Sequence, residues 1–189
     1  MNKTKVVWVI LILVFLVAAY MLGGAYTHKS ASAFALSSSA FANGGSIPSE
    51  YTCDGASTNP PLAFVNPPAG TQSYALTMWD PDVPTKVLAQ GYFNHWEAFN
   101  IPGTAMGLDA SSSVGTPGMN GSNQLGYTGP CPPPQYAPAE HRYIFTVYAL
   151  DSMLSLPQGA TRQQIEAAVA GHVLGFAQLV GKYKKVSAQ

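Results

Sequence analysis

Proline and glycine are concentrated in one part of this chain. All 15 prolines and 16 of the 18 glycines lie in residues 41–189, and most of them precede Leu156. Proline lacks a backbone donor and breaks a helix interior, and glycine weakens one. Long helices are therefore excluded between residues 41 and 156, and this part of the chain must fold from short elements joined by turns.

The segments between these residues have the composition of β-strands. Residues 73–80 (SYALTMWD), 95–101 (HWEAFNI) and 141–150 (HRYIFTVYAL) are rich in aromatic and β-branched side chains. Shorter strands are expected at 41–47 and 63–65. The sequence therefore predicts a mainly β, antiparallel domain.

Within residues 41–189 one helix is predicted, close to the C-terminus. Thr161 and Gln164 have the spacing of a capping box. Apolar residues follow at helical intervals before Gly181, namely Ile165, Val169, Val173, Phe176 and Val180. Strands first and a helix last predict a β-rich domain with a peripheral C-terminal helix.

The N-terminal segment has a different character. Residues 6–22 (VVWVILILVFLVAAYML) are almost purely aliphatic and aromatic, and a helix of about 20 apolar residues crosses the hydrocarbon core of a bilayer. We predict one N-terminal transmembrane helix, either an uncleaved signal anchor or a signal peptide cleaved after Ala33. Lys3 and Lys5 place the N-terminus in the cytoplasm, so the domain that follows is exported.

These features divide the chain into three parts. Residues 1–28 are the signal anchor or signal peptide, 29–40 are a tether rich in Ser and Ala, and 41–189 are the globular domain. The expected location is the cytoplasmic membrane, crossed once, with the C-terminal domain outside the cytoplasm. Cleavage after Ala33 would instead make the domain secreted or periplasmic.

The charge balance excludes one class of partner. Nine basic and nine acidic residues give a net charge of zero, and 10% of the residues are charged, against roughly 25% in a typical soluble protein. A broad basic surface for nucleic acid is therefore not expected.

The two cysteines fit an exported domain. Cys53 and Cys131 form an even pair, and in an oxidising compartment such a pair is more often a disulfide than anything reactive. The alternatives are a catalytic thiolate or half of a metal site, but neither cysteine belongs to a C-x-x-C motif. We therefore predict a disulfide between Cys53 and Cys131.

Three segments hold polar or rigid groups in defined positions. His141 and Tyr143 are two residues apart in a predicted strand, so their side chains share a face. Asp80 ends another predicted strand and precedes Pro81, which stiffens the backbone, and residues 129–134 (GPCPPP) form a rigid loop. Taken singly, each has an ordinary structural explanation, such as an Asx turn at Asp80.

The order of the motifs is more specific than any one of them. Along the chain follow Tyr51-Thr52-Cys53-Asp54-Gly55, Pro60-Pro61-Leu62, Asp80-Pro81-Asp82-Val83-Pro84-Thr85, His95-Trp96, Asn100-Ile101-Pro102, Gly126-Tyr127-Thr128-Gly129-Pro130-Cys131-Pro132-Pro133 and His141-Arg142-Tyr143. In this order, from Phe41 to Tyr183, the chain resembles the phosphatidylethanolamine-binding proteins, specifically their prokaryotic Raf-kinase-inhibitor-like branch. The resemblance implies an antiparallel β-sandwich-like fold.

The resemblance also implies a small pocket that accepts anions, such as phosphate or a phospholipid head group. Carried over by position, the residues that line it are Asp80, His95, Pro132, Pro133, His141 and Tyr143. The histidines and the tyrosine are expected to donate hydrogen bonds to an oxyanion, and the prolines to form a rigid wall. Asp80 is expected to orient a histidine or to meet a cationic head group.

One segment departs from the family's pattern. Before the His-Arg-Tyr triplet, relatives usually have a shorter segment that contains glycine, whereas this chain has residues 134–140 without glycine. The mouth of the pocket is therefore expected to differ, with the charge of Glu140 beside it.

The predicted function is non-enzymatic binding of a small anionic or phospholipid head-group ligand, without a cofactor or metal. A protein partner is a further expectation, and the membrane is a partner through the N-terminal helix. One alternative is inhibition or regulation of an extracytoplasmic protein such as a peptidase. Another is a hydrolytic enzyme, which the absence of HExxH, GxSxG and P-loop motifs argues against.

Overall fold

The structure is a computed structural model that describes residues 33–186. The predicted signal anchor or signal peptide, residues 1–28, lies outside the described residues. Within residues 33–186, no helix has the length and apolar character needed to cross a membrane.

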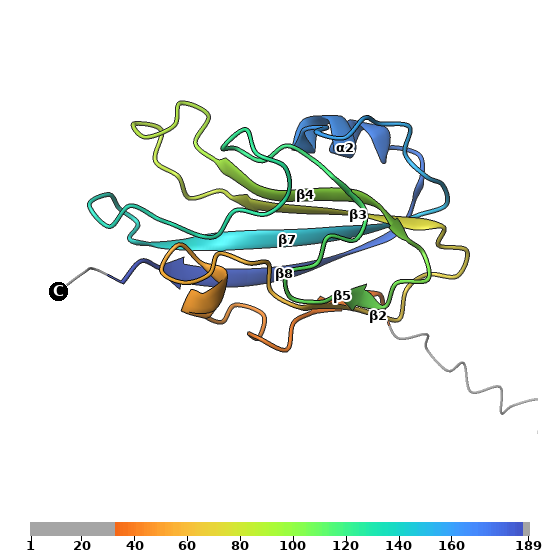
Figure 1. The fold of residues 1–189 in the computed structure, drawn as a ribbon, viewed down its shortest axis with the longest axis horizontal. Coiled ribbons are helices and arrows are strands. Elements are labelled where there is room, and N and C mark those ends of the chain that lie inside the picture. Colours follow the sequence, from red (N-terminus) through yellow and green to blue (C-terminus); the bar gives the residue numbers. More distant parts are fainter. Residues whose placement is uncertain (1–32, 187–189) are drawn as a thin grey trace, which may run out of the picture. The chain divides into compact units, whose positions relative to one another are not determined.

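The described residues form two antiparallel β-sheets (Figure 1). The larger sheet has the strand order β6-β4-β3-β7-β8, and the smaller has the order β1-β2-β5. The strands of the larger sheet are β3 (Ser73–Asp80), β4 (Phe93–Pro102), β6 (Thr116–Pro117), β7 (Glu140–Leu150) and β8 (Val173–Lys184). Those of the smaller sheet are β1 (Ala35–Ser37), β2 (Leu62–Val65) and β5 (Gly107–Leu108). The 3-10 turn η1 (Ser49–Tyr51) and helix α2 (Arg162–Ala168) lie in the connections.

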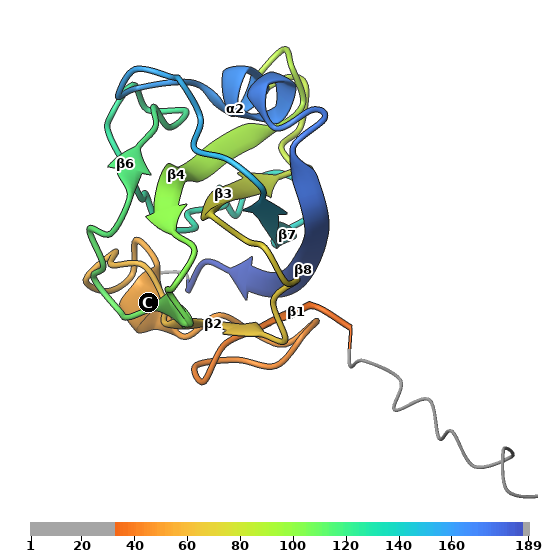
Figure 2. The same cartoon turned by 90° about the vertical axis from the view of Figure 1, so that its right-hand side faces the viewer.

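The two faces of the larger sheet pack against different neighbours (Figure 2). One face packs toward the smaller sheet through residues such as Met78 and Phe145. The opposite face packs against the segment around α2 through residues such as Phe99 and Ile165. Since both faces are covered, the central strand β3 is buried along almost its whole length. The predicted mainly β, antiparallel fold with a helix outside the sheets is confirmed.

Four of the five predicted strands are confirmed, at 63–65, 73–80, 95–101 and 141–150, with small shifts of their bounds. The strand predicted at 41–47 is wrong. Phe41 and Ile47 are buried in the core, but this segment pairs with β8 through a single bridge, between Ser46 and Lys182. Phe41 and Ile47 are apolar because this loop is buried in the core, and not because the segment is a strand.

The predicted C-terminal helix is correct only in its first part. Helix α2 is capped by Thr161 as expected and holds Ile165 in the core, but it ends at Ala168. Gly171 then has φ of +85°, a left-handed conformation that leaves the helix. The residues that follow are strand β8, which pairs with β7 along its length.

The burial pattern of β8 explains this difference. Ala177, Leu179, Gly181 and Tyr183 are buried and alternate with more exposed residues, which is the period of a strand. Phe176, which the helical spacing placed on the apolar face, is 62% exposed. The i, i+4 spacing of a few apolar residues was therefore coincidental in this segment, and pairing with β7 determined its structure.

The folded domain begins earlier than the predicted boundary at residue 41. Residues 35–37, within the segment assigned to a tether, form β1 and pair with β2. The side chain of Leu36 is buried in the core between the sheets, and the hydroxyl of Ser38 donates to the carbonyl of Pro61 at 2.6 Å. These contacts hold the end of the tether against the domain.

Candidate functional site

A cavity of about 380 Å³ lies where β3 ends and where β4 and β7 begin. All six residues that the sequence assigned to a pocket line it, namely Asp80, His95, Pro132, Pro133, His141 and Tyr143. They come from three strands and one loop, and the antiparallel order β4-β3-β7 brings these strand ends together. The structure therefore brings all six predicted residues together around one cavity.

A β-bulge directs His95 into this cavity. On β4, Trp96 pairs with Met78 and Asn94 pairs with Trp79, so His95 has no direct partner across the ladder. The extra residue lets His95 and Trp96 both face the side of the sheet on which Asp80 lies, although neighbouring residues in a regular strand point to opposite faces.

His95 is held by a backbone contact from the loop that precedes the proline wall. Its Nδ1 lies 2.8 Å from the carbonyl oxygen of Thr128, and a carbonyl can only accept. Nδ1 therefore carries the proton, and in the neutral ring Nε2 is an acceptor. Burial lowers the pKa of His95 to about 4, so the ring is neutral at pH 7.

This state of His95 differs from the sequence-based expectation. Both histidines were expected to donate hydrogen bonds to an oxyanion. His95 differs, because burial disfavours the imidazolium and the one N–H of the neutral ring already donates to the Thr128 carbonyl. The ring offers an acceptor to a ligand.

Asp80 orients the second histidine. Its Oδ2 accepts a 2.6 Å hydrogen bond from Nδ1 of His141, and its Oδ1 accepts one of 2.8 Å from the backbone N–H of Asp82. Burial raises the pKa of Asp80, and the hydrogen bond from His141 opposes this shift. Of the two expected roles of Asp80, the contact with a histidine is the one that the structure displays.

Two polar atoms at the cavity are buried and unpaired. Among the residues that the structure describes, neither Nε2 of His141 nor the hydroxyl of Tyr143 has a hydrogen-bond partner. Burial raises the pKa of Tyr143, so its hydroxyl stays protonated and can donate. Since buried polar groups are nearly always paired in native proteins, these two atoms mark a place for a polar ligand.

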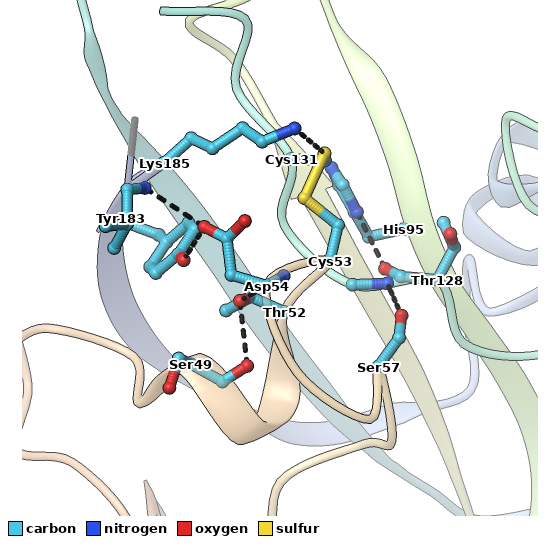
Figure 3. The surroundings of a disulfide bond; sticks show 12 residues. Ser49, Thr52, Cys53, Asp54, Ser57, His95, Thr128, Cys131, Tyr183 and Lys185 are labelled. Carbon is cyan, nitrogen blue, oxygen red and sulfur yellow. Dashed lines mark hydrogen bonds between the residues drawn. A yellow bond between two sulfur atoms is a disulfide. The ribbon is translucent and has the colours of Figure 1, made fainter. Parts of the chain in front are cut away.

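The proline wall is fixed to the rest of the domain by the predicted disulfide, which is confirmed (Figure 3). Cys53 and Cys131 are bonded, with their Cα atoms 5.4 Å apart. Two backbone contacts act beside it, from Cys53 N–H to the carbonyl of Pro130 at 3.1 Å and from Gly129 N–H to the hydroxyl of Ser57 at 2.9 Å. The loop before Pro132 and Pro133 is therefore held at several points.

Sequence reasoning missed the apolar part of the cavity. Val83, Val87 and Leu88 line it from the connection between β3 and β4, and Phe93 lines it from the start of β4. The position of Phe93 two residues before His95 was a usable signal. The other three were not identifiable, because their connection has no regular pattern.

The segment 134–140, which departs from the family's pattern, lies beside the cavity. Its Tyr136 is covered by Lys86, whose Nζ is 4.6 Å from the ring centroid. Glu140 is the first residue of β7 and is exposed. The described residues that line the cavity include none from 134–140. This segment therefore contacts the connection between β3 and β4 and does not form part of the cavity wall.

The charged groups next to the cavity are partly neutralised. Asp82 forms a two-point ion pair with Arg142, at 2.9 Å from Nε and 2.7 Å from Nη2.

Within residues 33–186 there is no group of three or more His, Cys, Asp or Glu side chains placed to hold a metal ion.

Comparison with known proteins shows which family this chain matches. The family model described as phosphatidylethanolamine-binding protein matches residues 37–184. The chain is 42% identical to a UPF0098 protein of Methanothermobacter thermautotrophicus, over 79% of this chain and 98% of that protein. It is 41% identical to a UPF0098 protein of Chlamydia pneumoniae with the same coverage.

Solved structures show the same fold. A crystal structure from Chlamydia trachomatis, of a protein named a homologue of phosphatidylethanolamine-binding protein, superposes with a TM-score of 0.77 at 38% identity, and the match covers 82% of this chain and 99% of that one. E. coli YbcL, at 24% identity and a TM-score of 0.72, shares the fold over 82% of this chain and 100% of its own. The chain therefore belongs to the phosphatidylethanolamine-binding protein family.

Proposed function

We propose that this protein is a non-enzymatic binding protein, located outside the cytoplasm, that takes a small phosphate-bearing ligand into the cavity beside His95 and His141. The observation that carries the proposal is the unpaired, buried pair of atoms at the cavity, Nε2 of His141 and the hydroxyl of Tyr143. A ligand with an oxygen that accepts from the Tyr143 hydroxyl and a second polar atom that pairs with Nε2 of His141 would satisfy both atoms.

The polar groups of the cavity offer donors and acceptors together. The hydroxyl of Tyr143 donates, and Nε2 of His141, whose Nδ1–H is bonded to Asp80, accepts in the neutral ring and donates in the doubly protonated ring. Nε2 of His95 accepts. The monoanion of a phosphate monoester matches this set, since it has two unprotonated oxygens for the donors and one P–OH for His95. A phosphoethanolamine group adds an ammonium, which Asp80 can attract.

The apolar side of the cavity suits a substituent on the phosphate. Val83, Val87, Leu88 and Phe93 line the same cavity as the polar groups. A volume of about 380 Å³ holds a head group and not two acyl chains, because ligand pockets of about 300–1,000 Å³ enclose molecules of drug size. The ligand class is therefore a phosphate with a short organic group.

Binding without catalysis is favoured by the partners of the histidines. Among the described residues, the hydrogen-bond partners of His95 and His141 are a carbonyl and a carboxylate. A nucleophilic hydroxyl or thiol activated by a histidine needs a direct hydrogen bond to that ring. The only cysteines, Cys53 and Cys131, are bonded to each other.

The test is calorimetric titration of the full chain in phosphatidylcholine nanodiscs. We expect saturable binding of inorganic phosphate and phosphoethanolamine, and no binding of ethanolamine alone. Tyr143→Phe removes only the donor and should weaken binding by about tenfold, the equivalent of roughly 1.4 kcal/mol. The control is Tyr148→Phe on the same strand, whose ring packs against Phe176 away from the cavity.

The outcomes separate the sources of the phosphate. If the ligand is a lipid head group, nanodiscs that contain phosphatidylethanolamine should compete with phosphoethanolamine, and if it is soluble they should leave its affinity unchanged. An absence of saturable binding by the wild-type chain, or equal affinity of Tyr143→Phe, would contradict the proposal and favour the regulation of a protein partner.

A further inference from the structure

Exposed apolar side chains gather at one end of the domain. The described residues include ten large hydrophobic side chains that are exposed, and six of them lie at the end where β3 and β8 begin and β4 and β7 finish. These six, the apolar end, are Val65, Met106, Met153, Val173, Leu174 and Phe176, and they are 40 to 66% exposed. Single exposed hydrophobic residues are ordinary, but such a group marks an interaction surface.

One loop connects the members of this group. A Cβ added at Gly70 would lie 3.9 Å from Leu174, and one added at Gly175 would lie 2.9 Å from Pro68, so the loop from 66 to 72 lies on the start of β8. The backbone of Gly103, in the turn that leads to Met106, donates to the carbonyl of Gln72 at 3.0 Å. The same loop lines a surface depression with Met153.

The chain enters the domain at this same end. Phe34 lies against Tyr74, with ring centroids 6.3 Å apart, and Ala35 pairs with Val65. Only ten residues, 23–32, separate the predicted membrane segment 6–22 from the first described residue. Fully extended, ten residues span at most roughly 35 Å. The predicted anchor therefore keeps the apolar end within reach of a bilayer.

The apolar end has few charged side chains, as expected for a surface that makes an apolar contact. The segments 63–73, 101–108, 147–155 and 169–177 contain no Lys or Arg. Their acidic and imidazole side chains are Asp151 and His172, which contact each other at 2.9 Å. Attraction to anionic lipids needs basic residues, whereas insertion of apolar side chains at the level of the head groups does not.

We propose that the apolar end is a membrane-docking surface, and that Val65, Leu174, Phe176 and their neighbours rest in the interface of the bilayer that holds the predicted anchor. The short tether makes this contact intramolecular and so raises its effective concentration. The occupant of the surface is a lipid bilayer, and not a second copy of the chain.

This docking places the phosphate cavity on the far side of the domain. β3 runs from Ser73 at the apolar end to Asp80 at the cavity, and seven steps of about 3.3 Å separate them by about 23 Å. The cavity then faces away from the lipid. A soluble phosphate compound reaches it more readily than a head group in the same membrane, a consequence that rests on the proposed function.

The experiment uses the full chain, with its native disulfide, reconstituted in phosphatidylcholine vesicles. A polarity-sensitive fluorophore is attached through Leu174→Cys at the apolar end or, as the matched control, through Lys184→Cys at the other end of the same strand. We expect spin-labelled lipid to quench the fluorophore at 174 at least about threefold more than at 184. Raising the salt concentration should not change this ratio, because the contact is not electrostatic.

A second variant distinguishes insertion of the apolar side chains into the bilayer from proximity that the anchor alone would cause. With the fluorophore attached through Val173→Cys, the double substitution Leu174→Ser and Phe176→Ser should abolish the excess quenching, and both positions are exposed enough to leave the fold intact. Equal quenching at 174 and 184, or quenching unaffected by the double substitution, would overturn the proposal. So would an apolar emission at 174 that lipid does not quench and that depends on protein concentration, because that result assigns the surface to a second copy.

Discussion

The imidazole Nδ1 of His141 donates a 2.6 Å hydrogen bond to Oδ2 of Asp80, 61 residues away in sequence. Both side chains are almost completely buried. A carboxylate in this position has two opposed effects on an anionic ligand, because it stabilises the imidazolium that attracts the ligand and also repels the ligand directly.

Asp80→Asn distinguishes these effects. The amide keeps the shape and can still accept from Nδ1, but it removes the charge that stabilises the imidazolium. If orientation and charging of His141 dominate, phosphate affinity should fall by about tenfold, and if repulsion dominates it should rise. Calorimetry decides the sign. Asp82→Asn is the control, since Asp82 pairs with the exposed Arg142.

The protonation state of His95 predicts discrimination between phosphate and sulfate. Nε2 of His95 is an acceptor down to about pH 4, because burial lowers the pKa of the ring to about 4. It therefore prefers a ligand oxygen that carries a proton. Phosphoethanolamine loses that proton with a pKa of about 6, so its affinity should fall by tenfold or more between pH 5.5 and pH 8. Sulfate has no such proton and should bind weakly throughout. Sulfate affinity equal to that of phosphate at pH 5.5 would show that His95 does not accept from the ligand.

Two tyrosines near the cavity should respond oppositely to loss of the hydroxyl. Tyr127 donates to the carbonyl of Tyr51 at 2.6 Å, so Tyr127→Phe removes a hydrogen bond and should lower the free energy of unfolding by about 1 kcal/mol. The hydroxyl of Tyr143 is buried without a partner in the described residues. Tyr143→Phe should leave stability unchanged or raise it while it weakens ligand binding. Denaturant unfolding of the ligand-free chain measures both, and a destabilised Tyr143→Phe would indicate a structural role for that hydroxyl.

A buried carboxyl on the other face of the sheet makes stability depend on pH. Glu97 is fully buried beneath α2, and neither of its oxygens has a partner among the described residues. Burial raises the pKa of Glu97 to about 8, opposed by Arg162 and reinforced by Glu166. The folded state then holds a proton that the unfolded chain loses above its ordinary pKa of about 4.5. Ionisation of Glu97 therefore has no effect on stability at low pH and lowers stability progressively between about pH 4.5 and pH 8.

Glu97→Gln should abolish this part of the pH dependence. The difference in melting temperature between Glu97→Gln and wild type should grow in favour of the variant as the pH rises from 5 to 8. The control is Glu50→Gln, which replaces an exposed carboxyl. A difference that stays constant with pH would mean that Glu97 is ionised in the folded protein.

Reduction of the disulfide should lower stability. The bond between Cys53 and Cys131 closes a loop of 78 residues, which in the chain-entropy model corresponds to about 4 kcal/mol. Both cysteines are exposed, so dithiothreitol can reach them. Thermal unfolding with and without dithiothreitol measures the effect, and the double substitution of both cysteines by serine should remove the response. Unchanged melting on verified reduction would show that the remaining contacts of the proline wall suffice.

Local sequence patterns were enough for β3, β4 and β7, the three long strands of the larger sheet before residue 156, but not for the two-residue strand β6. The segment 73–80 was predicted with its bounds, because aromatic and β-branched residues between turns report a preference that each residue carries alone. The disulfide was also predictable, since only two cysteines are present. The cavity residues were identified from the order of motifs, and not from any one motif.

The tertiary structure decided what depends on distant partners. Residues 173–184 are a strand because β7 offers a complete ladder, although their apolar spacing fits a helix. His95 enters the cavity because a bulge forms opposite Met78 and Trp79, and its proton faces Thr128, 33 residues away. Sequence determines the preferences of short segments, whereas hydrogen-bond partners, proton positions and buried unpaired atoms are set only when the strands meet.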